Sequence, residues 1–223
     1  MAKVVLIHTV AGLENVFGPL CDEIAPGLAP DHVVDESLLN DTIAAGMLTD
    51  DVRARFRARA EQARADGADV IMLTCSSVGP AANDLSDELG VTVLRVDEAM
   101  AERAVALGDR VGVAATLPTT LEPTAGLVRR AAERAGKAVD MTTELASGAF
   151  QALKAGDAAR HDELVQAALR SLAARVDVIV LAQASMARAL TGADSVEVDG
   201  RRIPVLTSPR LGVERLSDIA SGP

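Results

Sequence analysis

The sequence predicts an α/β fold of two similar lobes, each with a mostly parallel sheet. Short runs rich in Val, Ile and Leu alternate with longer segments rich in Ala, Arg and Glu, as is typical of buried parallel strands joined by helices. Hydrophobic residues make up 49% of the 223 residues and charged residues 24%, so the chain can bury a core and does not have the composition of a disordered protein. A repeat within the chain divides these elements into two halves.

The strands are expected where the apolar runs are short. Their ranges are 3–8, 32–35, 69–73, 92–94, 110–114, 138–142, 177–181 and 203–206. Helices are expected between them, most clearly over 50–66 and 157–175, because each range opens on an Asp suited to capping and carries charged residues on one side only. Further helices are expected over 13–24, 97–107 and 209–219.

The repeat consists of three pairs of segments in the same order and at nearly the same spacing. Residues 69–77 align without a gap with 177–185, residues 3–9 align with 110–116, and Val93 and Leu94 align with Val205 and Leu206. We therefore expect two flavodoxin-like lobes related by a pseudo-twofold axis. The first contains residues 1–107 plus 207–223, and the second contains residues 108–206.

The repeat also predicts where a ligand binds. In open parallel sheets ligands lie beyond the carboxyl ends of the strands, and in two-lobed proteins they often lie between the lobes. We expect the active site in the cleft between the lobes, lined by strand ends at Thr9, 74–77, 116–120 and 182–185.

Cys75 is the strongest candidate for chemistry. It follows an expected strand directly, and Ser77 and Pro80 after it suit the start of a helix. A helix N-terminus lowers the pKa of a thiol, so we expect Cys75 to be an acid or base. Cys21, inside an expected helix, is interpreted as a buried core residue.

A turn rich in hydroxyl groups occupies the equivalent place in the second half. Thr119 and Glu122 have the spacing of a capping box, and the other hydroxyl groups beside this helix start suit a carboxylate. His161 lies in a charged run that is expected on a solvated helix face.

Composition and motifs argue against several other functions. The chain has 22 Lys and Arg against 32 Asp and Glu, which gives a net charge of −10 and argues against nucleic acid and anionic membranes as partners. The two cysteines lack the spacing of a zinc site or a disulfide framework, which fits a cytoplasmic protein. The dinucleotide, P-loop, zincin and hydrolase motifs are missing from the sequence, so no cofactor or metal is indicated.

As a set, the motifs resemble the aspartate/glutamate racemase superfamily, which includes hydantoin racemase, maleate isomerase and arylmalonate decarboxylase. The resemblance spans nearly the whole chain and rests on the duplicated halves and four segments, LTCSS at 73–77, ATLPTT at 115–120, LAQASM at 181–186 and PVLTSP at 204–209. It implies cofactor-free chemistry at the carbon α to a carboxylate, with one cysteine from each lobe facing the substrate. It also implies substrate contacts, which together with the strand ends are Thr9, Ser76, Ser77, Thr116, Thr119, Thr120, Gln183 and Ser185.

The chain departs from the family pattern at Gln183, where the second cysteine would stand. In two-cysteine members one thiolate removes the α proton and the opposite thiol returns one, but a Gln amide has no useful pKa. We expect His8, at the end of the first strand, to join Cys75 as the second catalytic group. Ser185 is a further candidate, acting through a water.

These inferences lead to one expected function and two alternatives. We expect a cofactor-independent isomerase of the racemase or epimerase type, acting on a small amino acid or related acid with Cys75 as acid/base. A single-cysteine decarboxylase of the arylmalonate decarboxylase type needs only one proton donor and is the first alternative. The second is a non-catalytic binder of a small acid. The family's common habit predicts a homodimer.

Overall fold

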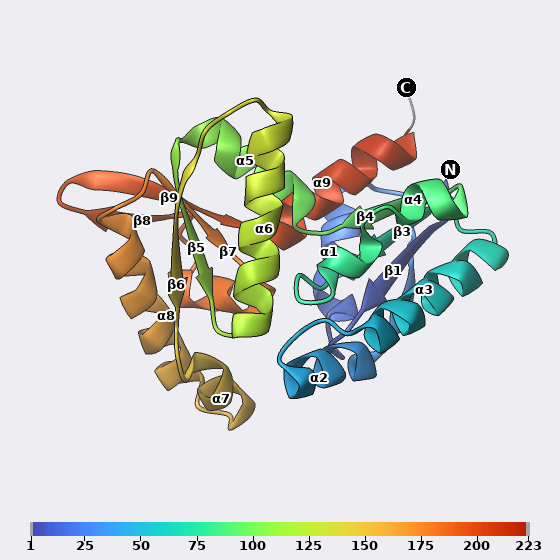
Figure 1. Ribbon diagram of the computed structural model, residues 1–223, viewed down its shortest axis with the longest axis horizontal. Coiled ribbons are helices and arrows are strands. Elements are labelled where there is room, and N and C mark those ends of the chain that lie inside the picture. Colours follow the sequence, from blue (N-terminus) through green and yellow to red (C-terminus); the bar gives the residue numbers. More distant parts are fainter. Residues whose placement is uncertain (1, 222–223) are drawn as a thin grey trace. The chain divides into compact units, whose positions relative to one another are not determined.

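The computed structural model describes residues 2–221, and its contacts divide the chain into two compact units (Figure 1). Unit 1 runs to Asp97 and resumes at Pro209, and unit 2 is Glu98–Ser208. Each unit contains its own sheet with helices packed on it, so the expected α/β fold with two sheets is confirmed.

Unit 1 contains a four-stranded parallel sheet in the order β2-β1-β3-β4. Its strands are β1 Val4–His8, β2 Asp31–Val34, β3 Val70–Leu73 and β4 Thr92–Arg95. Its helices are α1 Glu14–Ile24, α2 Glu36–Ala45, α3 Asp50–Ala65, the 3-10 helix η1 Gly79–Ala82, α4 Leu85–Leu89 and α9 Ser208–Ser221.

The two central strands of unit 1 are buried along their whole length, since helices cover both faces of the sheet. Alternate residues point to opposite faces. Ile7 and Leu73 pack in one core with Phe56 of α3, while Leu6 packs in another with Leu216 of α9. The last helix therefore returns to the first sheet, as the repeat predicts.

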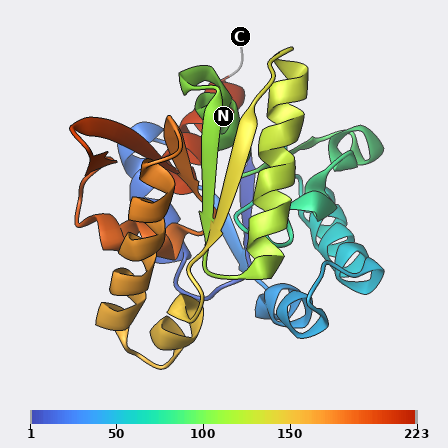
Figure 2. The ribbon, with the colours of Figure 1, turned by 60° about the vertical axis from the view of Figure 1, so that its left-hand side comes forward.

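Unit 2 contains a five-stranded sheet in the order β6-β5-β7-β9-β8. Its strands are β5 Arg110–Ala115, β6 Asp140–Leu145, β7 Val178–Leu181, β8 Ser195–Val198 and β9 Arg201–Thr207. Its helices are α5 Glu98–Leu107, α6 Pro118–Arg134, α7 Ala149–Lys154, α8 Ala158–Ala173 and the 3-10 helix η2 Ala184–Leu190. Strands β5 and β6 run side by side, and α6 and α8 lie on opposite faces of the sheet in both views (Figures 1 and 2).

The two sheets repeat one topology. In unit 1 the first strand lies between the second and third, and the fourth follows the third; β5, β6, β7 and β9 repeat this order in unit 2. The segments that align in sequence are therefore structurally equivalent strands. All eight expected strands are present, with the sixth shifted from 138–142 to Asp140–Leu145.

Among the described strands, β8 is the one that the sequence analysis did not predict. It pairs antiparallel with β9 through a hairpin turn at Asp199 and Gly200, both of which have positive φ angles. Asp-Gly is a common dipeptide for this kind of two-residue turn, so the signal was present in the sequence.

Helix α5 lies in a different unit from the one expected. The expected boundary placed residues up to 107 in the first lobe, whereas α5 packs on α6, β7 and β9 and belongs to unit 2. Within the part of the chain that the structure describes, the helices lack the length and hydropathy that a membrane span requires.

We predict that Gly212→Ala destabilises the protein by about 1 to 3 kcal/mol. A Cβ atom at Gly212 would lie 2.7 Å from the Val96 carbonyl oxygen, so α9 would have to move away from the sheet. Gly126→Ala in α6 is the matched control, because its Cβ would meet only the end of Arg130 at 3.6 Å. That control should stabilise by up to about 1 kcal/mol. Urea unfolding measures both, and equal effects would contradict the prediction.

Candidate active site

Cys75 lies two residues beyond the end of β3 and is only 9% exposed. Burial raises the pKa of its thiol, and the nearby Asp97 acts in the same direction. Hydrogen bonds from the Thr9 side chain and from the backbone N–H groups of Ser77 and Val78 oppose this rise without overcoming it. The resting form at neutral pH is therefore the thiol.

The expected lowering of the Cys75 pKa is wrong for two physical reasons. Desolvation outweighs the hydrogen bonds to the sulfur. In addition, the following helix η1 is a four-residue 3-10 helix with Val78 rather than Ser77 as its N-cap, so no long helix dipole faces the thiol.

Other expected substrate contacts of unit 1 lie around the thiol. Thr9, Ser76 and Ser77 are buried near the carboxyl ends of β1 and β3. The Thr9 hydroxyl is buried and, apart from the thiol, has no hydrogen-bond partner among the described residues. Unit 1 therefore places Thr9 and Cys75 in contact, while substrate binding by these residues stays a prediction.

A buried ion pair lies near Cys75 and was not anticipated. Arg95, at the end of β4, donates from Nε to Asp97 Oδ1 at 3.0 Å and from Nη2 to Oδ2 at 2.9 Å. The side chains are 4% and 0% exposed. The sequence did contain a signal for this ion pair, because Arg95 and Asp97 carry opposite charges and lie two residues apart at the end of a strand.

His8 is completely buried at the end of β1, and both of its ring nitrogens have partners. Nδ1 lies 2.8 Å from Thr74 Oγ1, and Nε2 lies 2.8 Å from His32 Nδ1. Thr74 Oγ1 also donates to the Ile7 carbonyl oxygen at 3.2 Å. Because that bond uses the only hydroxyl proton, His8 Nδ1 is the donor to Thr74 and Nε2 accepts from His32.

The pKa of His8 is lowered to about 4, chiefly by burial and to a smaller extent by the neighbouring His32, while Glu14 opposes the shift. His8 is therefore neutral at pH 7. The expectation that it is the second catalytic base stays a prediction. The geometry favours a positioning role, in which His8 holds Thr74 beside Cys75.

The low pKa of His8 predicts that acid destabilises the protein in a defined range. The unfolded chain takes up a proton at His8 near pH 6.5, whereas the folded chain does so near pH 4. Stability is thus full above pH 6.5 and decreases by up to about 3 kcal/mol as the pH falls to 4. Urea unfolding between pH 7 and 4 measures this loss. His8→Gln should flatten the dependence, and an unchanged slope in that variant would assign the loss to other groups.

In unit 2, Gln183 occupies the place that Cys75 has in unit 1. Its side-chain Oε1 accepts from the Thr116 backbone N–H at 2.6 Å, and its Nε2 donates to Thr116 Oγ1 at 2.8 Å. Thr116 is the repeat equivalent of Thr9, so the two units place equivalent residues in contact. Gln183 holds the ends of β5 and β7 together.

The other residues of unit 2 that are expected to contact the substrate differ in how far they are buried. Thr116 and Thr120 are buried, Ser185 is exposed, and Thr119 Oγ1 is a buried atom without a hydrogen-bond partner in the described part of the chain. The expected capping box is wrong, because α6 begins at Pro118 with Leu117 as a N-cap that makes no side-chain bond.

Glu122, the other member of the expected box, is paired instead with Arg129 at 2.7 Å. His161 also differs from expectation. It is buried rather than solvated, with Nδ1 2.7 Å from Asp162 Oδ1. Across residues 2–221, no cluster of three or more His, Cys, Asp or Glu side chains forms a potential metal site.

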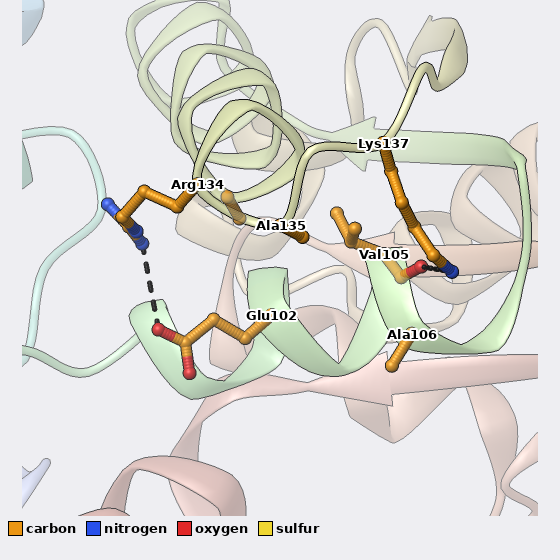
Figure 3. Close-up of a pocket in the computed structure, with 7 residues that line it drawn as sticks. Glu102, Val105, Ala106, Arg134, Ala135 and Lys137 are labelled. Atoms are coloured by element: carbon orange, nitrogen blue, oxygen red, sulfur yellow. Dashed lines mark hydrogen bonds and ion pairs between the residues drawn. The ribbon is translucent and has the colours of Figure 1, made fainter.

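A pocket of about 420 Å³ lies elsewhere in unit 2, between the carboxyl ends of α5 and α6 (Figure 3). Arg134 points towards Glu102 at 3.6 Å, and Lys137 donates to the Val105 carbonyl oxygen. The pocket contains none of the residues expected to bind substrate. Since these helix ends precede β5 and β6 in the chain, the pocket is on the edge opposite to the strand ends that hold Thr116 and Gln183.

Comparisons with solved structures give the same fold. The chain resembles a glutamate racemase isoform from Bacillus anthracis with a TM-score of 0.75 and 14% identity, covering 99% of this chain and 82% of that one. It resembles an aspartate racemase homologue from Pyrococcus horikoshii with a TM-score of 0.68 and 15% identity, covering 99% and 100%. Allantoin racemase from Klebsiella pneumoniae gives a TM-score of 0.65 and 15% identity, covering 99% and 88%.

A search of the curated proteins gives no match. The family model described as Asp/Glu/hydantoin racemase matches residues 17–216, which include both sheets apart from β1. This match covers most of the chain, and the resemblance expected from the sequence motifs is confirmed. The chain belongs to the Asp/Glu/hydantoin racemase family.

Proposed function

We propose that the protein is a cofactor-independent isomerase of the racemase or epimerase type, acting at the carbon α to the carboxylate of a small amino acid or related acid. Its family and fold are those of racemase-type isomerases. The observation that carries the proposal is Cys75, a buried thiol at a strand end with backbone N–H groups and a hydroxyl directed at its sulfur.

The proposed step is a proton transfer between Cys75 and the substrate. The Cys75 thiolate takes the α proton, so the C–H bond breaks, an S–H bond forms, and the electron pair stays on the substrate as an enolate. Return of a proton to the same face restores the substrate, and return to the opposite face gives the other isomer. The N–H groups of Ser77 and Val78 stabilise the thiolate, which burial otherwise disfavours.

Racemisation by proton transfer on both faces of the substrate needs a second acid/base group opposite Cys75. Both ends of the Gln183 amide are bonded to Thr116, and both nitrogens of His8 are bonded to Thr74 and His32. With Cys75 acting alone, the proton returns to the face from which it left. We therefore expect solvent exchange at the α carbon with retention of configuration to exceed inversion.

Decarboxylation of a malonate-type acid is the second candidate, and the raised pKa of Cys75 favours it. A resting thiol is already a proton donor. In this reaction the bond to one carboxylate breaks, CO2 leaves, and the carbanion takes the S–H proton, so one donor suffices.

Proton NMR in D2O tests the two reactions together. Wild-type protein is incubated with a panel of chiral amino acids and hydroxy acids, and with substituted malonates. Exchange of an α proton accompanied by inversion supports the isomerase, whereas exchange with retention alone shows one-sided proton transfer without isomerisation. CO2 release from malonates with single deuterium incorporation supports the lyase. If no acid of either class reacts, both proposals are wrong and the binding of a small acid without turnover remains.

The pH profile separates the two roles of Cys75. A base must be a thiolate, so because the pKa is raised, the exchange rate should increase from neutral into alkaline pH. A donor must be a thiol, so decarboxylation should be constant near neutrality and decrease in alkaline solution.

A further inference from the structure

Two polar groups near Cys75 are buried and have no oxygen or nitrogen hydrogen-bond partner among the described residues. One is the Thr9 hydroxyl, whose only partner is the Cys75 thiol and which has no oxygen or nitrogen partner. The other is Arg95 Nη1, whose guanidinium uses Nε and Nη2 to bind Asp97. Buried donors nearly always have a partner in folded proteins, and a guanidinium presents five N–H donors. The unpaired Nη1 edge of Arg95 therefore suits an acceptor that comes from outside the chain.

Arg95 is fixed beside the turn that carries Cys75. It is the register partner of Leu73, the last residue of β3, and the backbone N–H of Val96 bonds to the Leu73 carbonyl oxygen at 3.0 Å. Its guanidinium lies against Gly79, where an added Cβ atom would be 2.6 Å from Cζ. One short turn, residues 75–79, thus carries the thiol at its start and contacts the guanidinium at its end.

The charge arrangement fits an anion. Asp97 neutralises Arg95 through two of its nitrogens and leaves the third on the opposite edge of the planar group. The Nη1 donors of an arginine bind carboxylate oxygens well, because the bonds are charge-assisted and the planar group matches the carboxylate geometry.

We propose that Arg95 binds a carboxylate oxygen of the substrate through Nη1, and that it selects anionic acids over neutral amides and ureides at the Cys75 site. This rests on the proposed function, because it places the ligand of Arg95 at the thiol that performs the proton transfer. Gly79 takes part indirectly, since only a residue without a side chain leaves room for the guanidinium.

Isothermal titration calorimetry with malonate and succinate, and with their neutral diamides as matched probes, tests the proposal. Wild type should bind the anions at least about tenfold more tightly than the diamides, as expected for a charge-assisted bond. Arg95→Lys retains a cation beside Asp97 but loses the Nη1 donors, so it should lose that preference.

Arg53→Lys is the control, because Arg53 is an exposed residue of α3 that donates to the Pro80 carbonyl oxygen of η1 at 2.9 Å. It should bind like wild type. Diamides that bind as tightly as the anions, anions that do not bind wild type, or full anion preference in Arg95→Lys would each overturn the proposal.

A measurement on wild type avoids any folding defect of the variants. The 15N NMR signals of the Arg95 side chain should shift on titration with malonate and stay unchanged with malonamide. Unchanged signals under saturating malonate would show that the anion binds elsewhere. If malonate shifts these signals but no acid exchanges its α proton, Arg95 is an anion anchor and it is the isomerase proposal that fails.

Discussion

Replacing Cys75 with alanine is expected to abolish α-proton exchange, with a loss of at least about a hundredfold and up to about ten thousandfold. The thiol is the only acid/base group that we assign to the reaction, because His8 is buried with both nitrogens bonded and Gln183 has no useful pKa. Cys75→Ser should be nearly as inactive, since its hydroxyl is a far weaker acid. Deuterium incorporation measured by proton NMR gives the rate for each variant.

Cys21→Ala is the matched control for Cys75→Ala. Cys21 is also a buried free cysteine of unit 1, but it lies on α1 and packs against Phe17 and the sheet. Both variants remove a buried sulfur and should lose a similar amount of stability, whereas only Cys75→Ala should lose exchange. Full exchange in Cys75→Ala would remove Cys75 from the mechanism and leave a different group at the strand ends to be found.

The position of Cys75 could be predicted from sequence because it depends on local order alone. A buried strand that ends at Leu73 fixes where the next residues emerge, and the repeat indicates the equivalent edge of the other sheet. The contact between Thr116 and Gln183 follows from the same rule, since both residues come directly after neighbouring strands β5 and β7.

The partners of His8 could not be predicted in this way. They come from β2 and from the residue after β3, so their distances depend on the register between strands that lie far apart in sequence. From the sequence alone, a His at a strand end is interpreted as a candidate base, because its hydrogen-bond partners are not known. Once His32 and Thr74 occupy both nitrogens, the same residue reads as a buried neutral group.

The predicted lowering of the Cys75 pKa was wrong. The sequence indicates where the turn after β3 begins, but it shows neither the length of the helix that follows nor how deeply the thiol is buried. The helix that follows Cys75 is η1, which covers only four residues, and the thiol is buried in the hydrophobic cluster that contains Phe56 and Val78. Desolvation is a property of that packing. The burial of Arg95 and Asp97, which sequence alone would place at a solvated strand end, has the same origin.

Asp97→Ala is expected to destabilise the protein by about 3 to 5 kcal/mol. The substitution leaves the Arg95 guanidinium buried without its counter-ion, and a buried unpaired charge costs much more than an exposed one. Arg134→Ala is the comparison, since Arg134 pairs with Glu98 at 3.3 Å but is 50% exposed. It should change the free energy of unfolding by at most about 1 kcal/mol. Urea unfolding at pH 7 measures both.

The double variant Arg95→Met/Asp97→Leu separates the charge from the packing. Replacing both members of a buried ion pair by apolar residues of similar size is often neutral or stabilising, so this variant should recover most of the stability that Asp97→Ala loses. A double variant as unstable as the single one would mean that the shape of the pair, rather than its charge, holds this edge of the sheet.

Because Asp97 also raises the pKa of Cys75, the double variant Arg95→Met/Asp97→Leu should react faster with iodoacetamide than wild type at pH 8. It also lacks Nη1, so it should bind malonate and malonamide equally. Recovered stability together with lost anion preference would show that the pair is kept for binding rather than for folding.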